Sequence, residues 1–230
     1  MSDARRERGV GRVVAIDGPS GSGKSTIGRG VAAALGLRTL DTGAMYRAVT
    51  AAVLRAGADP KDGNRAAEIA RTVRITVEGG VTTLDGDDVS TEIRGPEVTG
   101  AVSTVAAHPP VRAELVARQR AWVAEHGGGV VEGRDIGSVV FPDAPVKVYL
   151  DASDEERARR RQRDEAAAAR EVSVADLQAS MAARDAADSG RAASPLVTAN
   201  GARVIDTTGR TPDDIVAEIV EAFRAAEGAP

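Results

Sequence analysis

A glycine-rich segment near the start of the chain has the residue types and spacing of a phosphate-binding loop. It matches the pattern G-x-x-x-x-G-K-[ST] and follows a short apolar run. Glycines allow successive backbone N–H groups to point at one anion, and a following helix adds its positive N-terminal end. Lys24 would reach the β- and γ-phosphates of a nucleoside triphosphate, and the Ser25 hydroxyl would ligate Mg²⁺. The predicted triphosphate-binding residues are Gly18, Pro19, Ser20, Gly21, Ser22, Gly23, Lys24, Ser25 and Thr26.

Other charged and polar residues stand where strands are predicted to end or helices to begin. Thr42 and Arg47 flank the start of a predicted helix, and Arg134 and Asp135 follow an apolar strand. In α/β proteins the carboxyl ends of the parallel strands form one edge, where ligands bind. A phosphate-binding loop alone is compatible with kinases, ATPases, GTPases and transport motors. One triphosphate site combined with several arginines favours a second substrate that also carries phosphate.

A later helix carries three charged residues whose spacing could form a binding surface. Arg184, Asp188 and Arg191 are spaced i, i+4 and i+7, which places them on one helix face. The spacing alone favours a simpler interpretation, a solvated helix face with internal ion pairs. The same alternative applies to the preceding arginine-rich segment, which contains Arg157, Arg159, Arg160, Arg161 and Arg163.

The elements that must hold these residues alternate between strand and helix. Apolar and alternating runs predict strands at 13–16, 37–40, 130–131, 147–151 and 203–206. Helical patterns predict helices at 26–35, 42–56, 65–72, 111–126, from 153 onward, 173–189 and 211–226. The alternation predicts an α/β fold, a three-layer P-loop architecture whose central parallel sheet is covered by helices on both faces.

Four residues are predicted to cap helices through their side-chain oxygens. Thr42 precedes the helix that carries Arg47, and Thr211 precedes a proline and two acids. Ser153 and Ser173 each stand three residues before an acid, which is the spacing of a capping box. These signals predict where the four corresponding helices begin.

One region interrupts the alternation with strand periodicity. Alternating runs at 73–77, 81–84 and 88–89 surround two turns rich in Gly and Asp, a pattern typical of hairpins. We therefore expect a small antiparallel insert over about residues 64–104. It is either an excursion without a role in binding or a subdomain that clamps a substrate.

Composition restricts the remaining function classes. The 230 residues fit one domain, and the net charge of −4 disfavours a nucleic-acid or anionic membrane surface. The lack of cysteine excludes disulfides and thiol catalysis, and two histidines are too few for a convincing metal site. No apolar run fits a transmembrane helix or a signal peptide, so we expect a cytoplasmic protein without a membrane partner. Without a large exposed apolar stripe, we expect a monomer.

Several segments together resemble bacterial cytidylate kinases. Besides the phosphate-binding loop, the similarity is carried by Leu40-Asp-Thr-Gly-Ala-Met-Tyr-Arg47, Glu132-Gly-Arg-Asp-Ile-Gly137, Val140-Phe-Pro-Asp-Ala-Pro145, Asp151-Ala-Ser-Asp-Glu-Glu-Arg157 and residues 184–195. Each of these segments is a weak signal by itself, whereas all of them in this order over nearly the whole chain are specific. The resemblance implies a nucleoside monophosphate kinase domain spanning residues 1–230. It would transfer the γ-phosphoryl group of ATP to CMP or dCMP with Mg²⁺.

The resemblance also implies roles for individual residues. The catalytic cations would be Lys24, Arg157 and Arg184. The residues that bind CMP would be Arg47, Arg134 and Arg184 at its phosphate, Ser103, Arg112 and Asp135 at the cytosine, Asp188 and Arg191 near the sugar, and Thr42 against the nucleotide. The insert at about 64–104 would be the monophosphate-binding region. The arginine-rich helix from Arg157 to about Arg170 would be the lid.

Two features depart from the family pattern, and other functions stay open. Asp185-Ala186-Ala187 stands where relatives often carry further arginines, and Thr42 stands where they often carry serine. A kinase for UMP or another small metabolite is the nearest alternative. A regulatory switch that binds ATP or GTP without turning over an acceptor is another alternative, and it predicts a guanine-reading Asn-Lys-x-Asp motif, which the sequence lacks. A nucleic-acid binder would need a basic patch and aromatic platforms, and only 2% of the residues are aromatic.

Overall fold

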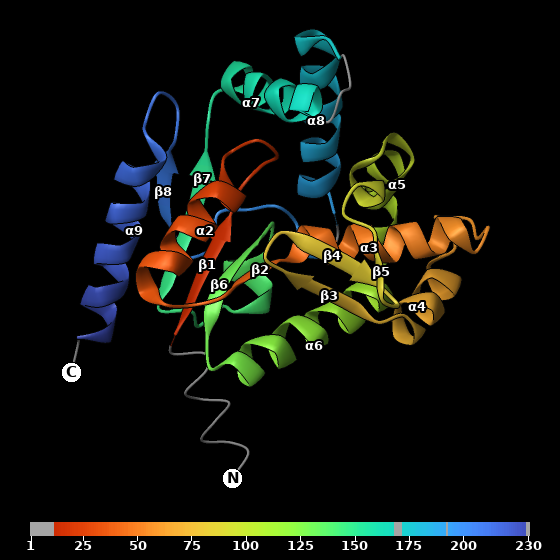
Figure 1. Ribbon diagram of the computed structural model, residues 1–230, viewed down its shortest axis with the longest axis horizontal. Coiled ribbons are helices and arrows are strands. Elements are labelled where there is room, and N and C mark those ends of the chain that lie inside the picture. Colours follow the sequence, from red (N-terminus) through yellow and green to blue (C-terminus); the bar gives the residue numbers. More distant parts are fainter. Residues whose placement is uncertain (1–11, 168–171, 192, 229–230) are drawn as a thin grey trace.

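The centre of the protein is a five-stranded parallel sheet, seen in a computed structural model that describes residues 12–167, 172–191 and 193–228. The strand order is β2-β6-β1-β7-β8, and every neighbouring pair is parallel, as the alternation of strand and helix predicts (Figure 1). The strands are β1 (Val13–Asp17), β2 (Thr39–Asp41), β6 (Gly129–Gly133), β7 (Val146–Asp151) and β8 (Arg203–Asp206). Because β1 lies in the middle, the phosphate-binding loop that follows it is central at the carboxyl edge of the sheet.

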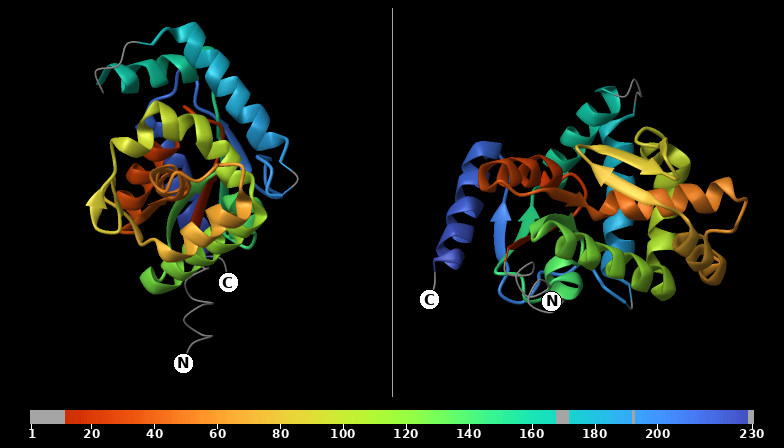
Figure 2. Two further views of the ribbon diagram at one scale, coloured as in Figure 1. Left: turned by 90° about the vertical axis from the view of Figure 1, so that its right-hand side faces the viewer. Right: turned by 60° about the horizontal axis from the view of Figure 1, so that its bottom comes forward.

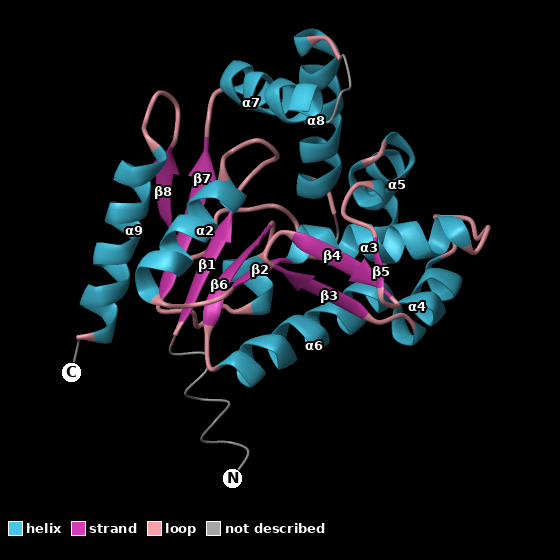
Figure 3. Cartoon of the chain, viewed as in Figure 1, coloured by secondary structure: helices cyan, strands magenta, loops and turns pink. Residues whose placement is uncertain are grey.

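Both faces of this sheet are covered because the side chains of β1 alternate between two hydrophobic cores. Val14 and Ile16 belong to a core that includes residues of α2 (Lys24–Leu35) and α9 (Pro212–Glu227). Val13 and Ala15 belong to the opposite core. That second core is completed by α3 (Thr42–Arg55), α4 (Gly63–Thr72) and α6 (Pro109–His126). The predicted three-layer α/β architecture is confirmed, and Figure 3 shows its helices on either side of the sheet.

The small antiparallel sheet that the sequence pattern predicts is present. Its strands are β3 (Ile75–Glu78), β4 (Val81–Leu84) and β5 (Asp87–Asp88), joined in that order. The helix predicted at 65–72 is confirmed as α4. The 3₁₀ turn η1 (Glu92–Arg94) and α5 (Pro96–Ala107), at the end of the range, have no counterpart in the sequence-based prediction. Proline is tolerated in the first turn of α5 because the N–H that it lacks has no partner within the helix.

Two further helices form an arm above the carboxyl edge of the sheet (Figures 1 and 2). α7 (Asp154–Ala167) and α8 (Val174–Ser189) pack against each other, and α8 also packs on α5. The predicted lid at about 157–170 falls on α7 and does not include α8, and its last predicted residues, 168–170, lie outside the described residues. No helix within the described ranges is long and apolar enough to cross a membrane.

Three of the four predicted helix caps are confirmed. The hydroxyls of Ser153, Ser173 and Thr211 each accept a hydrogen bond from the backbone N–H three residues later, at 3.3, 3.1 and 3.3 Å. Each bond satisfies an N–H that the following helix cannot use. These local sequence signals therefore correctly predicted where α7, α8 and α9 begin.

The fourth predicted cap, Thr42, is wrong. The carboxylate of Asp41 caps α3 instead, accepting a hydrogen bond from Ala44 N at 3.0 Å. Thr42 is the first residue of the helix, and its hydroxyl donates to Glu132 O on β6 at 2.7 Å. An acid directly before a threonine offers two candidate caps, and the neighbouring strand decides between them by taking the threonine hydroxyl.

Smaller differences concern element boundaries. β2 starts at Thr39 rather than at Leu37, and α6 starts at Pro109 rather than at Val111. A single π-helical turn, η2 (Ile136–Val140), follows β6 and has no counterpart in the sequence-based prediction. It directly follows Arg134 and Asp135 and so bears on their position.

Candidate active site

A cleft of about 560 Å³ opens at the carboxyl edge of the central sheet, beside the ends of β1, β2 and β6. Segments far apart in the sequence meet there: the phosphate-binding loop, the start of α3, α5, α6, the residues after β6 and both arm helices. Every residue predicted to bind CMP lines this cleft: Thr42, Arg47, Ser103, Arg112, Arg134, Asp135, Arg184, Asp188 and Arg191. Of the predicted triphosphate residues, Ser20 to Thr26 line it, whereas Gly18 and Pro19 do not.

The loop at residues 18–23 has a shape that requires glycine at three points, Gly18, Gly21 and Gly23, each of which has a positive φ. Gly18 has a φ of 149°, and a Cβ placed there would lie 2.1 Å from Leu150 O on β7. Gly23 has a φ of 95° directly before α2, so the helix starts at Lys24 with its free N–H groups facing the cleft. The N-terminal end of α2 is therefore an anion-binding surface at the middle of the sheet.

Lys24 and Ser25 meet a carboxylate that the sequence analysis did not assign. Lys24 Nζ donates to Gly18 O at 2.8 Å and to Pro19 O at 2.6 Å, and Ser25 Oγ donates to Glu132 Oε2 at 2.9 Å. Burial lowers the pKa of the Lys24 ammonium and raises the pKa of the Glu132 carboxyl. An anion against Lys24 and a cation against Glu132 would each offset part of this burial cost.

The oxygens of Ser25 and Glu132 suit Mg²⁺. This ion prefers hard oxygen ligands, and it commonly takes few of them from the protein and the rest from phosphates and water. Among the described residues, no group of three or more His, Cys, Asp and Glu side chains could hold a metal by itself. The donor set therefore fits an Mg²⁺ ion that is bound together with a phosphate ligand rather than a metal held by the protein alone.

A buried ion pair stands at the far side of the cleft from α2. Arg112 on α6 and Asp135 after β6 bind each other, and each side chain is only 5% exposed. The guanidinium of Arg112 also lies over the ring of Tyr46, 5.2 Å from its centroid, and donates to Ala106 O at 3.2 Å. Burial raises the pKa of Tyr46 to about 12, so its hydroxyl stays protonated. This pair presents both donors and an acceptor to the cleft without a net charge.

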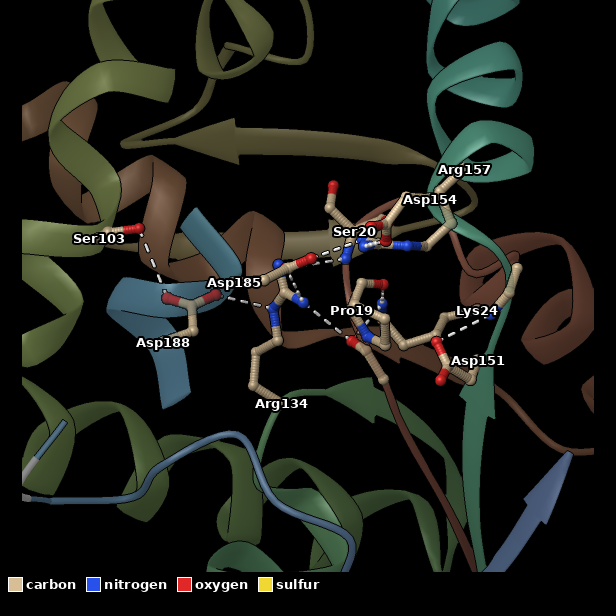
Figure 4. A network of polar contacts seen from close by, with 12 residues as sticks. Pro19, Ser20, Lys24, Ser103, Arg134, Asp151, Asp154, Arg157, Asp185 and Asp188 are labelled. Atoms are coloured by element: carbon tan, nitrogen blue, oxygen red, sulfur yellow. Dashed lines mark hydrogen bonds and ion pairs between the residues drawn. The ribbon is translucent and has the colours of Figure 1, made fainter. Parts of the chain in front are cut away.

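Asp188 on α8 is the centre of a second paired group. It accepts from Arg134 Nε at 3.0 Å and forms a close ion pair with Arg191, and Ser103 Oγ lies 3.5 Å away (Figure 4). The predicted single helix face for Arg184, Asp188 and Arg191 is incomplete because α8 ends at Ser189. Arg191 reaches Asp188 from the chain beyond the helix. We refer to Arg112, Asp135, Asp188 and Arg191 as the ion-paired cluster.

Two other arginines line the cleft without a carboxylate partner. Arg47 and Arg184 form no ion pair among the described residues, and Arg184 Nε is buried without a hydrogen-bond partner. Burial and the nearby charge of Arg184 lower the pKa of Arg47 to about 9. Burial and Arg134 lower the pKa of Arg184 in the same way. These unpaired arginines, Arg47 and Arg184, mark a place where the protein has concentrated positive charge for a ligand to neutralise.

A polar network fastens the arm to the outside of the phosphate-binding loop. Asp185 on α8 pairs with both Arg134 and Arg157 and accepts a long hydrogen bond from Ser20 N at 3.4 Å (Figure 4). The same arginines donate to loop carbonyls, Arg134 to Gly18 O and Arg157 to Ser20 O, both at 3.0 Å. Asp185 thus connects α8 to α7 and to the phosphate-binding loop. The sequence analysis noted Asp185 as a departure from the family pattern but did not predict this role.

Arg157, which the sequence analysis expects to be a catalytic cation, lies outside the lining of the cleft in this structure. Its guanidinium is occupied by Asp154, Asp185 and Ser20 O. The arm arginines that do line the cleft come later on α7: Arg160, Arg161 and Arg163. Arg161 is close enough to the unpaired arginines to lower the pKa of both. The sequence shows an arginine-rich helix, but only its packing decides which arginines face inward.

At the outer end of the cleft, Arg160 bridges the arm to the segment after β8. It donates to Thr207 Oγ1 and to Thr207 O, each at 2.9 Å, and pairs with Glu156 at 2.9 Å. Thr207, Arg210 and Pro212 line the same end of the cleft. This end is continuous with the N-terminal end of α2 and can receive the remainder of a nucleotide whose phosphates lie there.

A buried carboxylate fixes the segment that carries Arg134 and Asp135. Asp17, at the end of β1, accepts hydrogen bonds from Ile136 N and Gly137 N in η2, both at 2.7 Å. Burial raises the pKa of Asp17 to about 6, despite these two bonds. The central strand therefore holds η2, and through it the base of the ion-paired cluster.

Comparison with known proteins identifies the family to which this chain is similar. The family model described as cytidylate kinase matches residues 14–225. The cytidylate kinase of Mycobacterium avium (strain 104) is 50% identical over 216 residues, which cover 92% of this chain and 95% of that protein. The cytidylate kinase of Limosilactobacillus reuteri (strain DSM 20016) is 47% identical over 222 residues, covering 94% and 97%. A solved shikimate kinase from Acinetobacter baumannii aligns with a TM-score of 0.46 and 17% identity, covering 95% of this chain and 96% of that chain.

Proposed function

The chain belongs to the cytidylate kinase family, and from that premise we propose that its cleft transfers the γ-phosphoryl group of ATP to CMP or dCMP. The observation that carries the proposal is the arrangement of three sites along one cleft. A phosphate-binding helix end, two unpaired arginines and a neutral buried ion pair line the same cleft. Two nucleotides that meet end to end present a triphosphate, an acceptor phosphate and a polar, uncharged base, and these three groups match the three sites.

Asp135 and Arg112 supply the recognition of the base. A carboxylate accepts a hydrogen bond from the exocyclic amine of cytosine, and the guanidinium donates to a ring nitrogen or carbonyl of the same base. Uracil has a carbonyl in place of the amine, so two acceptors would face each other in a buried site. An unmatched buried polar group gives strong discrimination. Ser103 would assist this pair at the base, and Asp188 and Arg191 suit the sugar.

The transfer needs no nucleophile from the protein. An oxygen of the CMP phosphate attacks the γ-phosphorus of ATP while the bond from that phosphorus to the β,γ-bridging oxygen breaks, which gives CDP and ADP. The protein holds the two phosphates in line and offsets the charge of the transition state. Lys24 lies on the donor side, Arg47, Arg134 and Arg184 on the acceptor side, and Arg161 is the arm arginine that faces the transferred group.

Mg²⁺ fits the same site as the cofactor. Ser25 and Glu132 would hold it together with the phosphates of ATP, where its charge would neutralise the β- and γ-phosphate oxygens. The region at about 157–170, whose described residues lie on α7, would act as the lid over the reacting phosphates. It excludes water, which would otherwise accept the phosphoryl group.

The remaining assignments follow from the same premise. We propose one catalytic domain in which the region at about 64–104 binds the monophosphate and the region at about 157–170 is the lid. The protein would act as a monomer in the cytoplasm on small-molecule substrates alone, without a nucleic-acid or membrane partner. A single cleft within one chain holds residues for both substrates, which supports activity without a second subunit.

The test is the release of ADP from ATP and Mg²⁺ with CMP, dCMP, UMP, AMP or no acceptor, measured in parallel. We expect rapid ADP release with CMP and dCMP, and matching formation of CDP and dCDP by chromatography. Preferred turnover of UMP or AMP would contradict the roles of Arg112 and Asp135 while leaving a kinase. ADP release that does not depend on an acceptor would contradict phosphoryl transfer to a nucleotide.

A further inference from the structure

The unpaired arginine Arg47 is oriented by the insert rather than by its own helix. Arg47 projects from α3, and its Nη1 donates to Ile93 O at 2.8 Å and to Thr99 Oγ1 at 2.9 Å. Ile93 lies in η1 and Thr99 lies in α5, both after the antiparallel sheet. A guanidinium has five N–H groups in a rigid plane, so contacts at one nitrogen fix the plane and leave other N–H groups free for a ligand.

The chemistry of these two partners suits an arginine that must later bind an anion. Both are neutral oxygens, which hold the guanidinium without cancelling its charge. A carboxylate would hold it more tightly but would compete with an incoming phosphate. Arg184, Arg161 and Arg94 all repel Arg47. Without contacts that hold it, this Coulomb repulsion would favour orientations in which the Arg47 side chain turns away from the cleft. The insert therefore supplies the contacts that keep an unneutralised cation in place.

Thr99 is the only side chain in this pair of contacts, since Ile93 contributes a backbone carbonyl. Ser103 stands four residues later on the same helix, so the two hydroxyls lie about one turn apart on one face of α5. Ser103 lies beside Asp188 in the ion-paired cluster, whereas Thr99 contacts an unpaired arginine. One helix of the insert thus touches both the phosphate side and the sugar side of the proposed acceptor site.

We propose that Thr99 is a positioning residue for the acceptor phosphate: its hydroxyl holds Arg47 in the orientation that receives the phosphate of the monophosphate substrate. This inference rests on the proposed function, because it assumes that the unpaired arginines bind that phosphate. It gives the insert a part in the reaction, and so favours the substrate-clamping interpretation of the region over that of an excursion without a role. Thr99 itself touches Arg47 and does not line the cleft.

The experiment compares Thr99→Val with Thr99→Ser. Valine has nearly the shape of threonine but lacks the hydroxyl, whereas serine keeps the hydroxyl. We expect Thr99→Val to raise KM for CMP about fivefold, the value of one ordinary hydrogen bond, because the second bond, to Ile93 O, remains. KM for ATP should stay within twofold of the wild-type value, and Thr99→Ser should restore KM for CMP to within twofold.

Two controls separate positioning from a general structural effect. Thr72→Val removes a hydroxyl that donates to Ile69 O at 2.9 Å in the same region, far from any cleft arginine, and should leave both KM values unchanged. Cytidine, which has the base and sugar but no phosphate, should inhibit wild type and Thr99→Val with the same constant. Its affinity does not depend on Arg47 if the hydroxyl acts only through the phosphate.

Each other outcome overturns the proposal. An unchanged KM for CMP in Thr99→Val would show that Ile93 O alone orients Arg47. Equal weakening of CMP and cytidine would show that α5 has moved as a whole, and failure of Thr99→Ser would show that the methyl group matters instead of the hydroxyl. Turnover of CMP by the wild-type protein, measured in the same assay, tests the proposed function separately.

Discussion

Two groups of arginines in the cleft differ in how their positive charge is balanced. In the ion-paired cluster, Arg112 is matched by Asp135 and Arg191 by Asp188, so this side is nearly neutral before a substrate arrives. The unpaired arginines, Arg47 and Arg184, face each other with no carboxylate partner among the described residues. The difference indicates what each side binds. A neutral base needs oriented donors and acceptors, whereas a phosphate needs charge that the protein has not already neutralised.

This contrast also separates the energetic roles of the two sides. A buried ion pair is costly to break because one charge is left behind, so the ion-paired cluster contributes to stability as well as to recognition. An unpaired buried cation destabilises the empty protein and is stabilised only by its ligand. Substitutions on the two sides should therefore change activity and stability in different proportions.

The largest expected effect is that of Arg184→Gln. It should lower kcat/KM for CMP by roughly 10⁴-fold, within the range found when an arginine is removed from a phosphoryl-transfer site. The free energy of unfolding of the empty protein should stay the same or rise, because the change removes a cation repelled by Arg134. Steady-state kinetics and urea unfolding check both parts. A clear loss of stability would show that Arg184 has a neutralising partner and would break the comparison.

The next largest effect is that of Asp135→Asn on the other side. Leaving Arg112 buried without its carboxylate should cost about 4 kcal/mol of stability. Selectivity for CMP over UMP should fall by about 100-fold, since the asparagine amide can turn its donor toward the uracil carbonyl. Urea unfolding and the ratio of kcat/KM for the two nucleotides measure this. Unchanged selectivity would remove Asp135 from base recognition.

A smaller effect concerns Asp17, a buried carboxylate that has backbone N–H partners instead of a cation. Its pKa is raised from 3.8 to about 6, so the folded protein keeps this proton to higher pH than the unfolded chain does. The free energy of unfolding should therefore fall as pH rises from about 4 to about 6, by up to about 3 kcal/mol. Urea unfolding of wild type and Asp17→Asn across this range isolates the contribution. Parallel pH dependence of the two proteins would refute it.

The smallest effect comes from an ion pair on the surface of the lid. Glu155 and Arg159 are 2.7 Å apart, with side chains 65% and 59% exposed. Glu155→Gln should change stability by less than about 0.5 kcal/mol and leave both KM values unaltered. This variant serves as an exposed reference for the ion-paired cluster. It tests whether burial, rather than the presence of an ion pair alone, determines how much a pair contributes to the free energy of unfolding. A large effect on thermal unfolding would contradict that explanation.

Much of this arrangement could be predicted from local signals. The phosphate-binding loop, the parallel order of the strands and three helix caps depend on residues that are neighbours in the sequence, and the structure confirms them. Thr42 was misassigned because the choice between it and Asp41 depends on Glu132 O, ninety residues away. Local patterns contain no information about such a distant partner.

Which arginines of α7 face the cleft could not be predicted from the sequence for the same reason. Arg157 and Arg161 lie on one helix and differ only in what that helix packs against. Glu132 is an acid near the carboxyl end of β6, the strand beside β1 and the phosphate-binding loop, and this position could have identified it. In the sequence, Asp185 is notable only as a departure from the family pattern. In the structure it forms ion pairs with Arg134 and Arg157, which connect α8 to the segment after β6 and to α7.

Neighbouring residues of α8 serve opposite sides of the site, since Arg184 lines the cleft while Asp185 is fastened to the outside of the phosphate-binding loop. Each residue added to or lost from a helix turns everything after it by about 100°. A single insertion or deletion between the buried Met181 and Arg184 would thus carry both side chains away from their partners at once. Substitutions in this part of α8 are therefore tolerated more easily than insertions or deletions. Relatives whose arms differ in length should carry the difference elsewhere along the arm.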